Sequence, residues 1–383
     1  MKYKIALKIF LFILLLIPSF SFAQEEAAGE ILKGKVVEVV SETEEVNFLK
    51  DEPVTIQNLK VKDNKMGEIV DVYNDYAVVS VGQKVFYSVN DFGEGNYQNF
   101  LVEVSRTNQI ILLTILFIVV VAFFSGLKGI RSLFSLILSF FAIIFIMIPL
   151  ILKGVDPLII GPLLSFLILF FAIFFSYGFN KVSTVAFVGT SITVIFTSIL
   201  AFVSIKLFSL SGISDGTLVY LSFLPDVSIN LINLIIAGII IGVLGVLDDI
   251  AVTQVAVVRE LYLANEKITS KEVYQRAIRV GQDHVSALVN TLVLAYTGVA
   301  LPLILYFKLS NGSFESIISS ELVATEIVRT IVGSIGVVLA VPITTILAVK
   351  FLGKNRKELA SIKFEGGHSH GHDDHDHTHT HSH

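Results

Sequence analysis

The sequence predicts an α-helical polytopic membrane protein with about seven transmembrane helices, preceded by a small exported N-terminal domain that is all-β and OB-like. Three observations predict this fold class. The 383 residues are 54% hydrophobic and only 16% charged, whereas a water-soluble domain carries about 25% charged residues. Mean hydropathy is +0.77, and the apolar residues gather in long stretches. A polar segment with short alternating runs precedes those stretches.

Residues 1–23 have the three parts of a secretory signal peptide. Lysines open the segment, Ile9–Ile17 form an apolar core, and the triplet Ser-Phe-Ala at 21–23 provides a small-residue cleavage site. The alternative is an uncleaved anchor, but this core is short for crossing a bilayer. We therefore expect cleavage and export of the segment that follows.

Residues 24–107 form the predicted exported β domain. Five short segments alternate between polar and apolar residues, and turn-forming clusters separate them. These segments are 35–40, 54–62, 67–72, 84–89 and 100–104. Alternation with a period of two, interrupted by turns, is typical of a small antiparallel barrel or sandwich, and five strands suit an OB-like barrel.

Residues 108–355 form the predicted seven-helix transmembrane domain. Most of its apolar stretches approach or exceed the ~20 residues that a helix needs to cross the hydrocarbon core. The stretches are Ile110–Phe124, Leu133–Leu152, Leu158–Phe175, Val182–Phe208, Ile229–Leu247, Val285–Phe307 and Leu322–Phe351. Proline and glycine inside them do not argue against helices in a membrane.

The distribution of positive charge predicts the orientation. With the N-terminal domain outside, most lysines and arginines fall in the connections and the C-terminus that face the cytoplasm. The signal peptide predicts the same orientation. We therefore expect a multi-pass protein of the bacterial cytoplasmic (inner) membrane, with its N-terminal domain outside and its C-terminus in the cytoplasm.

The longest cytoplasmic connection predicts an amphipathic helix near residues 262–283. Thr269 followed by Glu272 forms a capping box, and Val273, Ala277 and Ile278 then share one face. This periodicity favours a packed or membrane-lying helix over a simple linker.

A stripe of small and polar residues at helical spacing begins inside the fifth apolar stretch and continues beyond its end. Asp248 is adjacent to this stripe, whose members are Gly238, Gly242, Gly245, Asp249, Thr253, Ala256 and Glu260. A carboxylate inside a membrane costs about 2.5–3.5 kcal/mol on insertion scales, and such residues tend to mark transport paths. Asp248 and Asp249 are therefore candidates for an oxygen-rich cation or proton site. In the alternative interpretation, one of them only caps a new helix at the interface.

The last two apolar stretches add further polar residues to the candidate path. Asp283 and Asn290 share one helix face, and Asn290, followed by Thr291, needs a hydrogen-bond partner, so we expect it to face other helices. Glu326 and Arg329 lie one turn apart. They either neutralise each other or close an external gate.

The tail at residues 356–383 is the strongest chemical signal in the sequence. Its imidazoles and carboxylates suit Zn²⁺, Ni²⁺ or Cu²⁺. The candidate ligands are His368, His370, His372, His375, His377, His379, His381, His383, Asp373, Asp374 and Asp376. An expression tag is the alternative, but tags are usually plain histidine runs. We expect Zn²⁺ or Ni²⁺ at the tail and no other cofactor.

Three segments resemble the YibE/F-like membrane proteins. They read GVLGVLDDIAVTQVAVVREL, VYQRAIRVGQDHVSALVNTLVLAYTGVALPL and EIVRTIVGSIGVVLAVPIT. The resemblance spans roughly residues 30 to 355 and implies the membrane architecture and, as a further expectation, transport. It assigns the functional positions to Asp248, Asp249, Asp283, Asn290, Thr291, Glu326 and Arg329. His284 and the histidine tail lie outside the family pattern.

The leading functional hypothesis is a permease for a small ion or solute, with a divalent metal as one candidate. Asp248, Asp249 and Asp283 would form the cation site, and Asn290 and Glu326 would line the path. The alternative is a sensor or scaffold that does not transport and whose exported domain binds an envelope ligand. We expect no enzyme, because the sequence contains no Walker A, G-x-S-x-G or H-E-x-x-H motif. The expected partners are lipid and the transported solute, with a homo-oligomer as an option and no nucleic acid.

Overall fold

The computed structural model of the chain describes residues 31–47, 52–92, 97–214, 216–223, 229–265, 267–309, 313–354 and 356. The predicted signal peptide and the histidines of the tail lie outside these residues. The chain divides into two compact units that meet between Phe124 and Ser125. Each unit is built around its own hydrophobic core.

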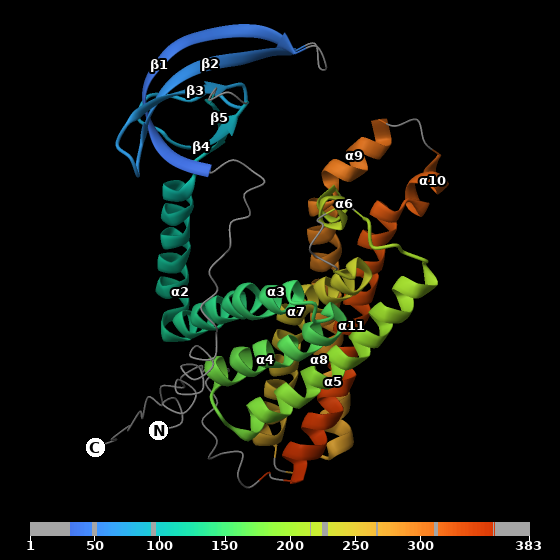
Figure 1. Ribbon diagram of the computed structural model, residues 1–383. Helices are drawn as coiled ribbons and strands as arrows, with labels where there is room; N and C mark the ends of the chain where they lie inside the picture. The colour runs from blue at the N-terminus through green and yellow to red at the C-terminus, as the bar shows by residue number, and fades with distance from the viewer. Residues whose placement is uncertain are drawn as a thin grey trace, which may run out of the picture. The chain divides into compact units, whose positions relative to one another are not determined.

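The first unit contains a closed five-stranded β-barrel, which confirms the sequence prediction (Figure 1). The strands are β1 (Ile31–Asn47), β2 (Glu52–Asp63), β3 (Ile69–Asn74), β4 (Lys84–Asp91) and β5 (Tyr97–Val104). Their order is β1-β2-β3-β5-β4, and β4 closes the barrel by pairing antiparallel with β1. β1 and β2 pair as far as Asn47 and Glu52, so together they form a long hairpin.

Buried polar side chains tie the barrel strands together. Tyr87 on β4 is fully buried and its hydroxyl donates to Asp63 Oδ2 at 2.7 Å. Asp63 Oδ1 accepts the backbone N–H groups of Lys65 and Met66, each at 2.6 Å. These hydrogen bonds lower the pKa of Asp63, the Met66 N–H contributing most and the Tyr87 hydroxyl next. The carboxylate thus fixes the turn after β2 against β4.

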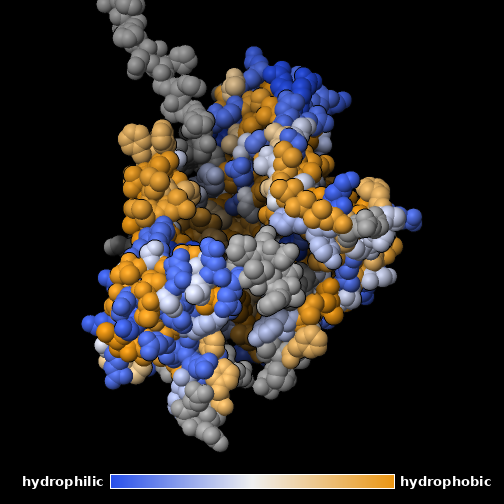
Figure 2. Space-filling view, turned by 90° about the horizontal axis from the view of Figure 1, so that it is seen from above, coloured by the Kyte–Doolittle hydropathy of each residue, from blue (hydrophilic) through white to orange (hydrophobic). Residues whose placement is uncertain are grey.

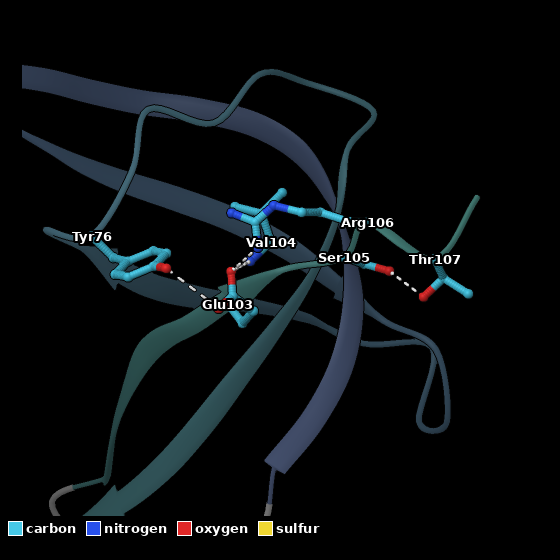
Figure 3. Close-up of polar contacts among 6 residues, drawn as sticks. All are labelled: Tyr76, Glu103, Val104, Ser105, Arg106 and Thr107. Carbon is cyan, nitrogen blue, oxygen red and sulfur yellow. Dashed lines mark hydrogen bonds and ion pairs between the residues drawn. The ribbon is translucent and has the colours of Figure 1, made fainter. Parts of the chain in front are cut away.

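A small polar cluster fixes the point where β5 leads into the first helix (Figure 3). Glu103 on β5 accepts a hydrogen bond from Arg106 Nη1 at 2.6 Å and one from the Tyr76 hydroxyl at 3.3 Å. The charge-assisted hydrogen bond lowers the pKa of Glu103 and raises that of Arg106. Beyond this cluster, Ser105 and Thr107 share a hydrogen bond at 3.2 Å as the helix begins.

Helix α2 (Thr107–Ala142) bends at Gly126, which divides it into two membrane-span candidates. Gly126 has φ 56° and ψ −144°, a conformation that glycine adopts far more readily than residues with a Cβ. The part before the bend belongs to the barrel's unit, and none of its residues in the most apolar window is buried. Its large side chains, such as Leu112, Leu113 and Phe123, are therefore free to contact lipid.

The second unit is a helical bundle that begins after the bend. Its elements after α2 are η1 (Ile143–Met147), α3 (Ile148–Leu152), α4 (Pro157–Tyr177), α5 (Lys181–Leu207), α6 (Gly216–Ser222), α7 (Leu231–Ala264), α8 (Ser270–Val299), α9 (Leu301–Leu309), α10 (Phe314–Ser319) and α11 (Glu321–Lys354). α5, α7 and α11 pack against one another, α4 covers α5 and α7, and α8 lies against α11 and α7 (Figure 1).

Among the residues that the structure describes, six helical segments are long and apolar enough to cross a membrane, and a seventh span results if the bent pair of α8 and α9 counts as one. The two helices of this pair meet at 56°. Hydrophobic side chains cover broad areas of the visible surface in Figure 2, as expected for a protein whose surroundings include lipid. The fold is thus that of a polytopic helical membrane protein with an N-terminal β-barrel.

The predicted amphipathic helix near residues 262–283 is not a separate element. α7 continues to Ala264, and α8 runs without interruption from Ser270 through the predicted sixth span. The capping box is confirmed, because Thr269 Oγ1 accepts the Glu272 N–H and the Glu272 carboxylate accepts the Thr269 N–H. Val273 and Ala277 are buried, so this face packs in the bundle.

Candidate functional site

Asp248 and Asp249 line a cavity of about 600 Å³ between α2, α4 and α7. They lie in the middle of α7, which is continuous from Leu231 to Ala264. The interpretation that one of them caps a new helix is therefore wrong. Asp248 is half-buried, whereas Asp249 is exposed.

Hydroxyl groups face the two carboxyls across this cavity. α2 contributes Ser132, Ser135 and Ser139, and the end of α4 contributes Ser176 and Tyr177. Ser135 is buried, and its backbone carbonyl accepts the Ser139 hydroxyl at 2.9 Å. The cavity thus offers neutral oxygen donors on two walls and carboxylates on the third. An array of this kind can replace part of the hydration shell of a cation, or pass a proton.

The sequence analysis missed these hydroxyl residues although a signal for them is present. Ser132, Ser135 and Ser139 are spaced by three and four residues, which places them on one face of a helix. A serine stripe in an apolar helix is ambiguous by itself, since such residues also serve ordinary helix packing. Only the fold brings the stripe opposite Asp248.

The glycines of α7 keep the cavity open. Gly242 and Gly245 line it, and a Cβ added at Gly245 would meet no atom within 4 Å. A Cβ at Gly242 would lie 3.1 Å from the hydroxyl oxygen of Tyr296 on α8. The glycine stripe predicted from the sequence is thus not covered by a neighbouring helix at Gly238 and Gly245, whereas the Tyr296 hydroxyl lies beside Gly242.

Other glycines provide the close helix contacts in this bundle. An added Cβ at Gly161 of α4 would lie 2.8 Å from the Cβ of Ala237, and one at Gly336 of α11 would lie 2.5 Å from Thr197 Oγ1. At both positions the absence of a side chain lets two helix backbones approach closely.

α8 does not bring its predicted site residues to this cavity. Asp283, Asn290 and Thr291 are exposed, on the side of α8 away from the buried Val285 and Leu292. The expectation that Asn290 packs against other helices of this chain is therefore wrong. The buried face of α8 carries its apolar residues, and the polar ones point outward.

The remaining predicted residues lie outside the cavity lining. Thr253 is half-buried, one turn beyond Asp249. Glu326 and Arg329 form an ion pair on α11, with Oε1 and Nη2 3.3 Å apart and both side chains about one-third exposed (28% and 31%). The ion-pair interpretation is therefore confirmed, and the gate remains a prediction.

The described residues contain no group of three or more His, Asp or Glu side chains placed to hold a metal ion. Asp283 therefore does not join Asp248 and Asp249 in a three-carboxylate site. Two carboxyls and several hydroxyls remain, a donor set that suits hard cations that keep part of their water. The histidine and aspartate ligands predicted in the tail lie outside the described residues.

Comparison with known families matches the membrane domain. The model of the YibE/F-like proteins matches residues 113–354, which is more than half of the chain and includes every residue that lines the Asp248 cavity. The match begins within the first part of α2 and leaves the β-barrel outside. Neither a curated protein nor a solved structure matches this chain. The chain belongs to the YibE/F-like family.

Proposed function

We propose that the chain is a membrane permease for a small ion or solute, with a divalent metal as a candidate cargo. The observation that carries this proposal is the cavity in which Asp248 and Asp249 face the hydroxyls of α2 and α4. Carboxylates are expensive inside a membrane and tend to face water-filled cavities on ion or proton paths. A purely structural bundle gains nothing from two adjacent carboxyls at the middle of a span.

The chemistry of the cavity favours a hard cation or a proton as the transported species. Its donors are all oxygen atoms, which Mg²⁺ and Mn²⁺ prefer, whereas the imidazoles of the tail suit Zn²⁺ or Ni²⁺. We therefore assign the tail a separate role as a metal buffer or regulator. The Glu326–Arg329 pair and Tyr296 are the candidate gate beyond Gly242.

The proposed location is the bacterial inner membrane, with the barrel outside and the C-terminus in the cytoplasm. The support is the distribution of positive charge, including Lys350 and Lys354 at the end of α11. In this orientation a cargo would reach Asp249 from the cytoplasmic half of the cavity.

The test is ion flux in proteoliposomes that contain the full chain, with Mg²⁺, Mn²⁺, Zn²⁺ and Ni²⁺ as separate cargoes and a pH-sensitive dye for protons. Asp248→Asn and Asp249→Asn should each lower flux by roughly tenfold or more, which corresponds to about 1.4 kcal/mol in the rate-limiting interaction. Asp283→Asn is the matched control, because Asp283 does not line the cavity. Unchanged flux of every species in both cavity variants would disprove the site.

A chain ending at Glu365 tests the tail. We expect its flux to equal that of the full chain, because the proposed site lies between α2, α4 and α7. A sensor is the second candidate, and the separate core of the β-barrel favours it. Absence of flux from the full chain, with Zn²⁺ still bound by the tail, would replace the permease by the sensor.

A further inference from the structure

A second cavity, of about 510 Å³, opens between the start of α8 and the end of α11. It shares no lining residue with the Asp248 cavity. Its lining combines hydroxyl, cationic and apolar residues: Ser270, Tyr274, Lys350, Lys354, Ile346, Val349 and Gly353. A lining with cationic and apolar side chains, at the end of a membrane-spanning helix, suits a ligand that has both a charged and an apolar part.

Tyr262 of α7 holds the two helices of this cavity in place. The hydroxyl oxygen of its buried side chain lies 3.2 Å from both Ser270 Oγ and the Val349 carbonyl oxygen, within hydrogen-bond distance of each. A Cβ at Gly353 would lie 2.8 Å from that hydroxyl oxygen, so glycine permits the close approach. The Arg356 guanidinium lies over the Tyr262 ring, 4.4 Å from its centroid. The polar wall is therefore fixed before any ligand arrives.

The charge around the cavity favours an anion. Lys350 and Lys354 are exposed, and within the described ranges neither forms an ion pair with a carboxylate. The acidic residue in the first turn of α8 is Glu272, and its carboxylate accepts hydrogen bonds from the Thr269 N–H and hydroxyl. The positive end of the α8 dipole, close to Ser270, adds to the two lysines.

The apolar wall indicates that the anion carries hydrocarbon. Ile346 is 51% exposed and lies one turn before Lys350, on the side toward the middle of α11. A lysine pair at the membrane boundary beside an open apolar surface fits the headgroup and first acyl carbons of an anionic lipid. We propose that this cavity binds an anionic phospholipid, with its phosphate between Lys350, Lys354 and the hydroxyls of Ser270 and Tyr274.

The experiment is native mass spectrometry of the full chain, released from nanodiscs of mixed phosphatidylglycerol and phosphatidylcholine. The wild type should retain phosphatidylglycerol, and its Tm in detergent should rise when this lipid is added. Lys350→Gln combined with Lys354→Gln should weaken lipid retention by roughly tenfold or more, because each basic residue at the surface contributes to binding an anionic lipid. Replacing both lysines by arginine should preserve retention.

Lys271→Gln combined with Lys308→Gln is the matched control, since it removes the same charge outside the cavity. Equal losses in the control and the cavity variant would overturn the proposal in favour of unspecific charge attraction. Wild-type retention by the glutamine variant would also overturn it. Inorganic phosphate that raises the Tm as much as phosphatidylglycerol does would replace the lipid by a soluble anion.

Discussion

The Asp63 carboxylate in the barrel is an example of one residue whose ionisation stabilises a whole domain. Its folded-state pKa is lowered by the N–H of Met66 and by the hydroxyl of Tyr87. A group with a lowered folded pKa contributes stability above its unfolded pKa of about 3.9, and the contribution is lost as the pH falls through the folded pKa. Acid should therefore unfold the barrel partly by protonating Asp63.

Removing the Tyr87 hydroxyl tests this linkage. Tyr87→Phe should cost about 1.5–3 kcal/mol at neutral pH, because the lost hydrogen bond reaches a charged acceptor. It should also move the acid transition of the barrel to higher pH, since the folded pKa of Asp63 returns toward its unfolded value. The chain contains no tryptophan, so Phe86→Trp gives a fluorescence signal from the barrel alone.

Tyr76→Phe is the control for this change. Tyr76 is exposed, and its hydroxyl donates to Glu103 at 3.3 Å at the surface of the barrel. The acid transition of Tyr76→Phe should stay close to that of the wild type, because Arg106 is the main cause of the lowered pKa of Glu103 and the Tyr76 hydrogen bond is the smallest. Identical transitions in Tyr87→Phe and the wild type would show that Asp63 does not control the acid stability of the barrel.

Helix α8 packs on the bundle through a side that leaves no room at Gly281. A Cβ built there would lie 2.4 Å from Gln254 Nε2 on α7 and 2.5 Å from Val341 Cγ1 on α11. Gly281→Ala should therefore destabilise the protein by about 1–3 kcal/mol through overpacking, measured by thermal unfolding in detergent. Gly298→Ala on the same helix meets no atom within 4 Å and should leave the Tm within error of the wild type. Equal Tm values for both variants would contradict this packing.

The strands and helices were predictable from the sequence where one pattern of hydrophobic residues dominates a segment. Alternation in 54–62 and 84–89 predicts β2 and β4, and unbroken apolar runs predict the membrane-spanning helices. The joint between α7 and α8 was predictable only in part, because the sequence predicts a separate amphipathic helix near residues 262–283, whereas α7 extends to Ala264 and α8 runs from Ser270 to Val299 without a break. The direction in which Asn290 points was also not predictable, since helical spacing groups residues on a face without specifying what that face contacts.

The candidate site was predictable only in part. Asp248 and Asp249 are rare charges in an apolar helix, and the sequence alone singles them out. Their serine partners come from a helix more than 100 residues earlier in the chain, and only tertiary packing selects them. Asp283 is a carboxylate like Asp249, but it lies on an outward face of α8. The prediction that it shares a cation site with Asp248 and Asp249 was therefore wrong, because it used residue type alone.

At the scale of the whole molecule, the bent pair of α8 and α9 determines the topology. If α8 and α9 together cross the bilayer once, the chain has seven spans, and the barrel and the end of α11 lie on opposite sides. If they do not cross, six spans place both on the same side. The distribution of positive charge favours seven spans, because seven spans place Lys350 and Lys354 on the side of the membrane opposite the barrel.

Cysteine labelling can distinguish these two topologies, because the chain has no cysteine of its own. We expect Val78→Cys, at an exposed barrel position, to react with a membrane-impermeant maleimide in intact spheroplasts. Lys354→Cys, at the end of α11, should react only after the membrane is permeabilised. Labelling of both positions in intact spheroplasts would contradict the seven-span topology, and it would also contradict the lysine cavity, because the start of α8 and the end of α11 would then lie on opposite sides of the membrane.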